Sequence, residues 1–230
     1  MEKSKDPFAL QREHLIAEIE AEALLTASHT GRSVFRKEVL AAVARVPRHE
    51  FVPVELKAYA YLNRPLPIGF EKTVSQPFIV ALMTDVLDLK PTDVVLEVGT
   101  GAGYQAAVLA ELVTRVYTID IIEELASGAE KRLERLGYAN LAFKAGNGYY
   151  GWGEHAPYDK IIVTAASDLV PPPLMAQLAP GGRMIIPTGM PDRQALTLVE
   201  KTRAGSLSTR DLLPVRFSEL EEPDRFAGAA

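Results

Sequence analysis

A glycine-rich turn, Glu97-Val-Gly-Thr-Gly-Ala-Gly-Tyr104, joins the apolar run 94–96 to a helical pattern over 105–112. Its three glycines allow a ligand to approach the backbone closely, and the N-terminus of the following helix faces that ligand. A strand, a glycine turn and a helix in this order are typical of α/β proteins that bind nucleosides. The turn therefore predicts an α/β enzyme with a nucleoside cofactor.

Short apolar runs alternate with amphipathic helical patterns through the rest of this region. Strands are expected at 94–96, 116–119, 141–144, 160–163, 184–186 and 196–200, the last as an edge strand, and helices at 105–112, 123–136 and 171–178. Continuous apolar runs separated by such helices are typical of a parallel sheet that is covered on both faces. We therefore expect a doubly wound, Rossmann-like α/β fold.

The segment that precedes the sheet is organised differently. Three helices are predicted there, at 11–25, 35–46 and 77–89. Between the second and third lies an irregular stretch with several prolines and aromatic residues. A long irregular segment within a compact protein is usually functional or a lid.

These patterns divide the chain into three parts. We expect an N-terminal part of helices with a loop that covers substrate and cofactor, a Rossmann-like core, and a C-terminal edge strand near 214–217 followed by a tail. The corresponding residues are 1–90, 91–200 and 201–230.

Composition excludes several kinds of site and partner. The 230-residue chain has no cysteine, and its four histidines have no metal-ligand spacing, so we expect no disulfide and no metal site. A net charge of −5, a pI near 5.5 and the lack of a long basic run disfavour nucleic acid. No signal-peptide core or membrane-length apolar run occurs, so a cytoplasmic protein without membrane association is expected. The sequence does not indicate an oligomeric state.

The charge of Glu97 bears on which cofactor the turn binds. The stretch Gly101-Ala-Gly-Tyr-Gln-Ala106 also satisfies the dinucleotide fingerprint, with Asp120 where a ribose-binding carboxylate belongs, so spacing alone leaves NAD open. A carboxylate at the end of the first strand opposes a pyrophosphate but suits the ammonium and sulfonium of S-adenosylmethionine. Glu97 therefore favours the methyl donor, although a carboxylate here can also serve to cap the loop backbone.

Two further segments follow predicted strands. Gly146-Asn147-Gly148 stands at the height of an adenine ring, where the Asn147 side chain can hydrogen-bond an exocyclic amine, although Asn-Gly is also a common turn. Thr164-Ala-Ala166 has small side chains that leave room for substrate beside the methyl group or simply ease helix packing.

Six motifs in order across roughly residues 35–217 together resemble the protein-L-isoaspartate O-methyltransferase family. They are Val46-Pro-Arg-His-Glu-Phe-Val52, Arg64-Pro-Leu-Pro-Ile-Gly69, Thr73-Val-Ser-Gln-Pro77, Leu96-Glu-Val-Gly-Thr-Gly-Ala-Gly-Tyr-Gln-Ala106, Tyr158-Asp-Lys-Ile-Ile-Val-Thr-Ala-Ala166 and Leu178-Ala-Pro-Gly-Gly-Arg183. Several motifs at family-like separations are far more specific than any one of them.

The resemblance implies an S-adenosylmethionine-dependent methyltransferase that esterifies the free α-carboxylate of L-isoaspartyl residues in damaged proteins and peptides, which leads to protein repair. In that family the serine of the Thr-x-Ser turn is the active-site residue, a role that falls here on Ser75, with Thr73, Gln76 and Thr164 toward the substrate. The expected cofactor-binding residues are Glu97, Gly99, Thr100, Gly101, Gly103, Asp120, Ile121, Asn147 and Gly148.

The chain departs from the family pattern at two places. Gly69-Phe-Glu-Lys72 stands where the family typically has Gly-x-Gly-Gln, and Asn147 stands where an aspartate is usual. The first change leaves open a different methyl acceptor or a cofactor-binding protein without turnover. An NAD-dependent dehydrogenase is the remaining alternative, but the sequence offers it no evident catalytic His or Tyr-Lys pair.

Overall fold

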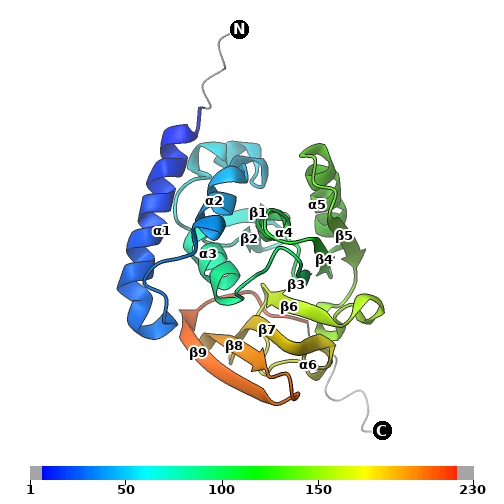
Figure 1. Ribbon diagram of the computed structural model, residues 1–230. Coiled ribbons are helices and arrows are strands. Elements are labelled where there is room, and N and C mark those ends of the chain that lie inside the picture. The colour runs from blue at the N-terminus through cyan, green and yellow to red at the C-terminus, as the bar shows by residue number, and fades with distance from the viewer. Residues whose placement is uncertain (1–6, 222–230) are drawn as a thin grey trace.

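Residues 7–221 are described by a computed structural model, and a single large sheet forms their centre (Figure 1). Within this part of the chain the sheet has seven strands in the order β5-β4-β3-β6-β7-β8-β9. They are β3 (Val94–Val98), β4 (Arg115–Asp120), β5 (Leu141–Ala145), β6 (Tyr158–Val163), β7 (Leu178–Thr188), β8 (Gln194–Lys201) and β9 (Leu207–Val215). Strands β3 to β7 pair in parallel, whereas β8 is antiparallel to both of its neighbours. The doubly wound α/β prediction is confirmed, with an antiparallel extension at one edge.

Alternate side chains of the central strands enter different cores. Val95 of β3 packs with the N-terminal helices, whereas Leu96 and Val98 pack on the other face. This alternation follows from the two-residue period of a strand. Burial on both faces explains why these strands are continuous apolar runs in the sequence. The helices that follow them are α4 (Tyr104–Ala110), α5 (Glu123–Arg135) and α6 (Pro172–Gln177).

Three N-terminal helices cover one side of the sheet (Figure 1). They are α1 (Ala9–Thr30), α2 (Lys37–Arg45) and α3 (Pro77–Val86). Pro77 supplies the fixed φ angle suited to the first turn of α3, and every residue of that helix is buried. Ile19 of α1, Leu82 of α3 and Val95 of β3 belong to one apolar cluster. The N-terminal helices therefore share a core with the sheet.

The stretch between α2 and α3 contains more regular structure than its prolines predict. It forms two 3₁₀ helices, η1 (Arg48–Glu50) and η2 (Val54–Tyr59), and a hairpin of β1 (Leu66–Gly69) and β2 (Lys72–Val74). The hairpin turns at Phe70 and Glu71, whose φ angles are 52° and 56°. Two positive φ angles in succession match the tight turn that suits a hairpin, although neither residue is a glycine.

The last part of the sheet differs from the prediction. Strand β7 begins at the residue after α6, much earlier than 184, and β8 is an interior strand rather than an edge. The edge strand is β9, which starts well before 214. Its first five residues are exposed, so it lacks the apolar alternation that reveals a strand. The tail predicted beyond 221 lies outside the described residues. Between residues 7 and 221 no helix is long and apolar enough to cross a membrane.

Ile19→Ala tests whether α1 belongs to the main core. The Ile19 side chain is fully buried, so its truncation should lower the free energy of unfolding by about 2–5 kcal/mol in urea titrations. Leu24→Ala on the same helix, where the side chain is 67% exposed, should change it by less than about 0.5 kcal/mol. A loss confined to a separate early transition would show instead that α1 folds as its own unit.

Candidate active site

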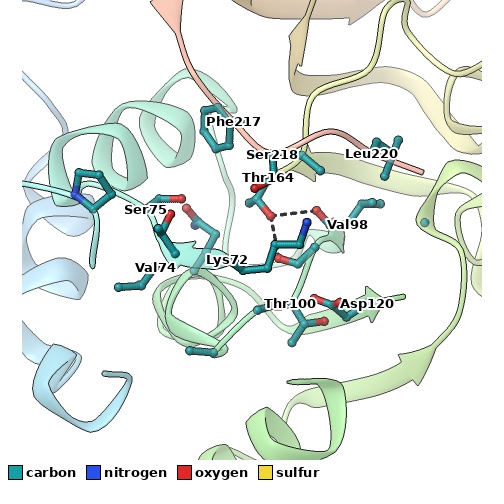
Figure 2. Close-up of a pocket in the computed structure, with 18 of the residues that line it drawn as sticks. Lys72, Val74, Ser75, Val98, Thr100, Asp120, Thr164, Phe217, Ser218 and Leu220 are labelled. Carbon is teal, nitrogen blue, oxygen red and sulfur yellow. Dashed lines mark hydrogen bonds between the residues drawn. The ribbon is translucent and has the colours of Figure 1, made fainter. Parts of the chain in front are cut away.

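A cavity of about 1180 Å³ lies between the β1–β2 hairpin and the carboxyl ends of strands β3, β4 and β6 (Figure 2). Ligands of open α/β sheets bind at this edge. Most of the predicted site residues line it: Thr73, Ser75, Gln76, Gly99, Thr100, Gly101, Asp120, Ile121, Asn147, Gly148 and Thr164. Glu97 and Gly103 do not. The cavity is also lined by Glu22, Lys72 and the segment 213–221, which were not among the predicted site residues.

The glycine turn adopts a backbone shape that requires its glycines. Gly99, Gly101 and Gly103 have φ angles of 94°, 52° and 89°, in the left-handed region. A Cβ on Gly99 would lie 2.3 Å from Thr164 Oγ1, and one on Gly103 would lie 2.9 Å from Leu133 Cδ1. The turn is thus packed tightly against Thr164 and Leu133. Gly103 serves that packing rather than contact with the cavity.

Asp120 is fixed at the end of β4 by two backbone donors. Its carboxylate accepts hydrogen bonds from the Gly101 amide (2.7 Å) and the Ile122 amide (2.9 Å). Each oxygen keeps a further lone pair for a ligand hydroxyl. A carboxylate held in this way can accept hydrogen bonds from a ribose, and that contact stays a prediction.

Glu97 belongs to β3, two residues before Gly99, and its side chain does not line the cavity. It is fully buried, accepts a hydrogen bond from the Thr118 hydroxyl (2.5 Å), and that hydroxyl is 2.7 Å from the hydroxyl of Thr100. Burial raises the pKa of Glu97 to about 8, so at pH 7 the carboxyl is mostly protonated. The sequence predicted that Glu97 is charged and faces the ligand. The structure instead gives Glu97 a neutral form and an indirect connection to the cavity through Thr118 and Thr100.

Asn147 has the turn role that the sequence suggested, whereas its contact with adenine stays a prediction. Its side-chain oxygen accepts the Tyr149 amide (2.9 Å) and caps the short helix η3 (Gly148–Tyr150), as a turn residue does. The side chain also lines the cavity, where its amide group is available to an adenine ring. A Cβ on Gly148 would lie 2.3 Å from Val98 Cγ1, so the backbone there packs directly on β3.

Ser75 lines the cavity in the segment between β2 and α3 (Figure 2). The residue that caps α3 is Gln76, without a side-chain cap bond, so Ser75 does not act as the helix cap. The Ser75 carbonyl oxygen instead accepts a hydrogen bond from Arg48 Nη2 (2.8 Å). Its hydroxyl has no hydrogen-bond partner among residues 7–221, which leaves it available to a substrate.

Arg48 links the two sides of the cavity. The side chain is fully buried, donates from Nε to the Ala60 carbonyl (2.9 Å) and places its guanidinium 4.6 Å from the ring centre of Tyr104. Tyr104 is the first residue of α4, directly after the glycine turn. Burial lowers the pKa of Arg48, and the described residues offer it no carboxylate partner. The arginine therefore holds backbone and an aromatic ring rather than an anion.

Two segments distant in sequence complete the lining. Glu22 of α1 accepts a hydrogen bond from Gln76 Nε2 (3.2 Å), and burial raises the pKa of Glu22. Beyond β9, the chain runs across the loop after β6: the Ala166 amide donates to the Ser218 carbonyl (2.8 Å), and the Leu220 amide donates to the Ala166 carbonyl (2.6 Å). Nothing in the sequence indicated that the second segment lines the cavity, because its residues match no binding motif.

Thr73 and Thr164 both line the cavity, in different ways. Thr73 is exposed, on the side of β2 opposite Val74. Thr164 Oγ1 donates to the Gly99 carbonyl (2.7 Å), so its proton holds the glycine turn and only its lone pairs face a ligand. The described residues contain no cluster of His, Asp or Glu that could hold a metal ion.

Comparison with known proteins identifies a consistent set of relatives. The profile of the family Protein-L-isoaspartate(D-aspartate) O-methyltransferase (PCMT) matches residues 19–224. Protein-L-isoaspartate O-methyltransferase 1 of Polaromonas sp. (strain JS666) is 58% identical, over 94% of this chain and 92% of the relative. The protein of the same name from Cupriavidus necator is 57% identical, over 94% and 83%. A solved protein-L-isoaspartate O-methyltransferase structure has a TM-score of 0.78 at 30% identity and covers 92% of this chain and 66% of its own.

Glu97→Gln should remove a pH dependence of stability. Because the folded pKa of Glu97 lies near 8 and the unfolded value near 4.5, its protonated form stabilises the fold fully below about pH 4.5, and this contribution is lost as the pH rises through 8. Wild-type stability should therefore fall by a few kcal/mol more than that of the variant between pH 5 and 9. Thermal melting of both ligand-free proteins across this range measures the difference. Parallel curves would contradict the buried, neutral carboxyl.

Proposed function

Because the chain belongs to the protein-L-isoaspartate O-methyltransferase family, it is an S-adenosylmethionine-dependent protein carboxyl methyltransferase, and we propose that its reaction takes place in the cavity between Ser75 and the glycine turn. The substrates proposed are proteins and peptides that contain L-isoaspartyl residues, methylated on the free α-carboxylate. A cytoplasmic location, and the absence of nucleic-acid and membrane partners, remain predictions.

The residues of the glycine turn fit S-adenosylmethionine. Glu97 Oε1, two residues before Gly99, is a buried oxygen atom without a hydrogen-bond partner in the described structure. A cation above the turn favours the ionised form of that carboxyl. Asp120 would hold the ribose and Asn147 the adenine. The cofactor supplies an electrophilic methyl group when it is bound there.

Ser75 would orient the acceptor. A carboxylate with a pKa near 4 is already ionised at pH 7, so its oxygen needs no general base to attack a methyl group. The Ser75 hydroxyl can donate to the second carboxylate oxygen and hold the first in line. This task is alignment and exclusion of water rather than proton transfer.

The other predicted substrate residues have supporting tasks. The Thr164 hydroxyl donates its proton to the Gly99 carbonyl. Its lone pairs can therefore accept a hydrogen bond from an N–H of the substrate backbone. Gln76 donates a hydrogen bond to Glu22 and so fixes the end of the segment between β2 and α3. Thr73 is exposed on β2. The observation that carries the proposal is that Ser75, with a free hydroxyl, and the glycine turn line one cavity.

Methyl transfer to an isoaspartyl peptide tests the function. With tritiated S-adenosylmethionine, base-labile label should enter a peptide that contains isoaspartate and not its twin that contains aspartate. Ser75→Ala loses a hydrogen bond to a charged group, worth about 1.5–3 kcal/mol, so kcat/KM for the peptide should fall roughly 10- to 100-fold. Retained cofactor binding without label in the isoaspartyl peptide would reject this substrate.

Arg48→Met tests the link between the two sides of the cavity. The variant leaves the Ser75 carbonyl without its donor, so we expect kcat to fall about 10-fold or more, with a smaller effect on the KM for S-adenosylmethionine. Arg48→Lys, which can keep one of these bonds, should recover part of the loss.

Tyr158→Phe is the matched control for Arg48. The buried Tyr158 hydroxyl donates to the Trp152 carbonyl (2.6 Å), and neither residue lines the cavity. If both changes lower stability but only the arginine variant lowers kcat, Arg48 has a positioning role. An equal effect of the two on kcat would mean that loss of stability alone is responsible.

A further inference from the structure

We propose that Lys72 binds a carboxylate inside the cavity and thereby sets the affinity of the enzyme for an anionic ligand. The inference rests on the proposed function for the identity of the peptide substrate. It concerns a cationic side chain that lines the cavity and that the proposed roles of Ser75, Thr164 and Asp120 do not use.

The hairpin directs the Lys72 side chain inward. Lys72 begins β2 opposite Gly69, and side chains alternate along a strand, so Lys72 shares a face with the buried Val74 and not with the exposed Thr73. Figure 2 shows the Lys72 chain extended across the cavity toward Thr164. The tight turn and the Leu66–Val74 pairing fix where β2 starts.

The ammonium group of Lys72 has no anion to satisfy it. Within residues 7–221 it makes no hydrogen bond and no ion pair, whereas Lys57 contacts Glu50 (3.4 Å) and Lys201 donates to the Leu178 carbonyl (2.8 Å). Lys72 is also half-buried, in contrast to the exposed Arg216 at the rim of the cavity. A half-buried cation without a partner interacts strongly with an anion that enters.

Most of the other charged side chains that line the cavity are negative. The carboxylates that line it are those of Glu22, Glu71, Asp120, Glu219 and Glu221, and the lining cations of the described chain are Lys72 and Arg216. A carboxylate ligand would therefore meet a net negative surface. Lys72 provides the positive charge that lies deepest in this surface.

The chemistry of the reaction predicts which kinetic parameter responds. As the carboxylate oxygen forms its bond to the methyl carbon, the carbon–sulfur bond breaks, and the negative carboxylate and positive sulfonium become a neutral ester and a neutral thioether without proton transfer. A nearby cation stabilises the charged carboxylate more than the partly neutralised transition state. Lys72 should therefore tighten binding without raising kcat.

Lys72→Gln, which removes the positive charge and keeps a polar side chain, is the test. It should raise the KM for the isoaspartyl peptide about 10-fold, leave kcat equal or higher, and weaken the salt dependence of KM. Lys72→Arg should stay within a few-fold of the wild type. Lys90→Gln, the same change at an exposed lysine away from the cavity, should have no effect.

Calorimetry separates the two possible sources of the carboxylate. S-adenosylhomocysteine and, in its presence, the isoaspartyl peptide are titrated into wild type and Lys72→Gln. Weaker peptide binding alone assigns Lys72 to the substrate, and weaker S-adenosylhomocysteine binding alone assigns it to the cofactor's carboxylate. If neither affinity changes by more than about twofold, the inference is overturned. If the wild type does not methylate the peptide, the proposed substrate fails, while these titrations still decide the role of Lys72.

Discussion

A buried arginine holds the two halves of this site in register. Arg48 donates to the carbonyl of Ser75 and stacks on Tyr104, so one side chain fixes both the acceptor loop and the start of the helix that follows the glycine turn. It does so without a carboxylate partner in the described structure. Neutral carbonyls and a ring face stabilise the cation while leaving it unpaired, which makes the arrangement dependent on exact packing around η1.

The cofactor side depends on a second layer of interactions. Thr164 holds the Gly99 carbonyl from β6, Asp120 holds the Gly101 amide from β4, and Thr118 connects Thr100 to Glu97 below. Strand β4 thus contributes two of these contacts to the glycine turn, and the residue that follows β6 contributes one. Because burial raises the pKa of Glu97 to about 8, a cation near the turn, or a higher pH, increases the ionised fraction of its carboxyl.

Sequence patterns predicted the parallel core and most of the lining, because buried strands are apolar throughout and the glycines are needed where φ is positive. The hairpin β1–β2 was missed because its turn residues, Phe70 and Glu71, are not turn formers. Strand β9 was misplaced because its exposed half shows no alternation. The neutral state of Glu97 follows from burial, which no local pattern reports, and Lys72 required knowledge of which face of β2 points inward.

A structure of the complex with cofactor product and peptide can test directly where methyl transfer takes place. In crystals with S-adenosylhomocysteine and an isoaspartyl peptide, the cofactor's sulfur should lie over the glycine turn, and the peptide carboxylate should lie within about 3 Å of Ser75 Oγ, facing that sulfur. A peptide carboxylate bound elsewhere, or a cofactor seated away from Gly99 and Asp120, would contradict the assignment of this cavity as the site of methyl transfer.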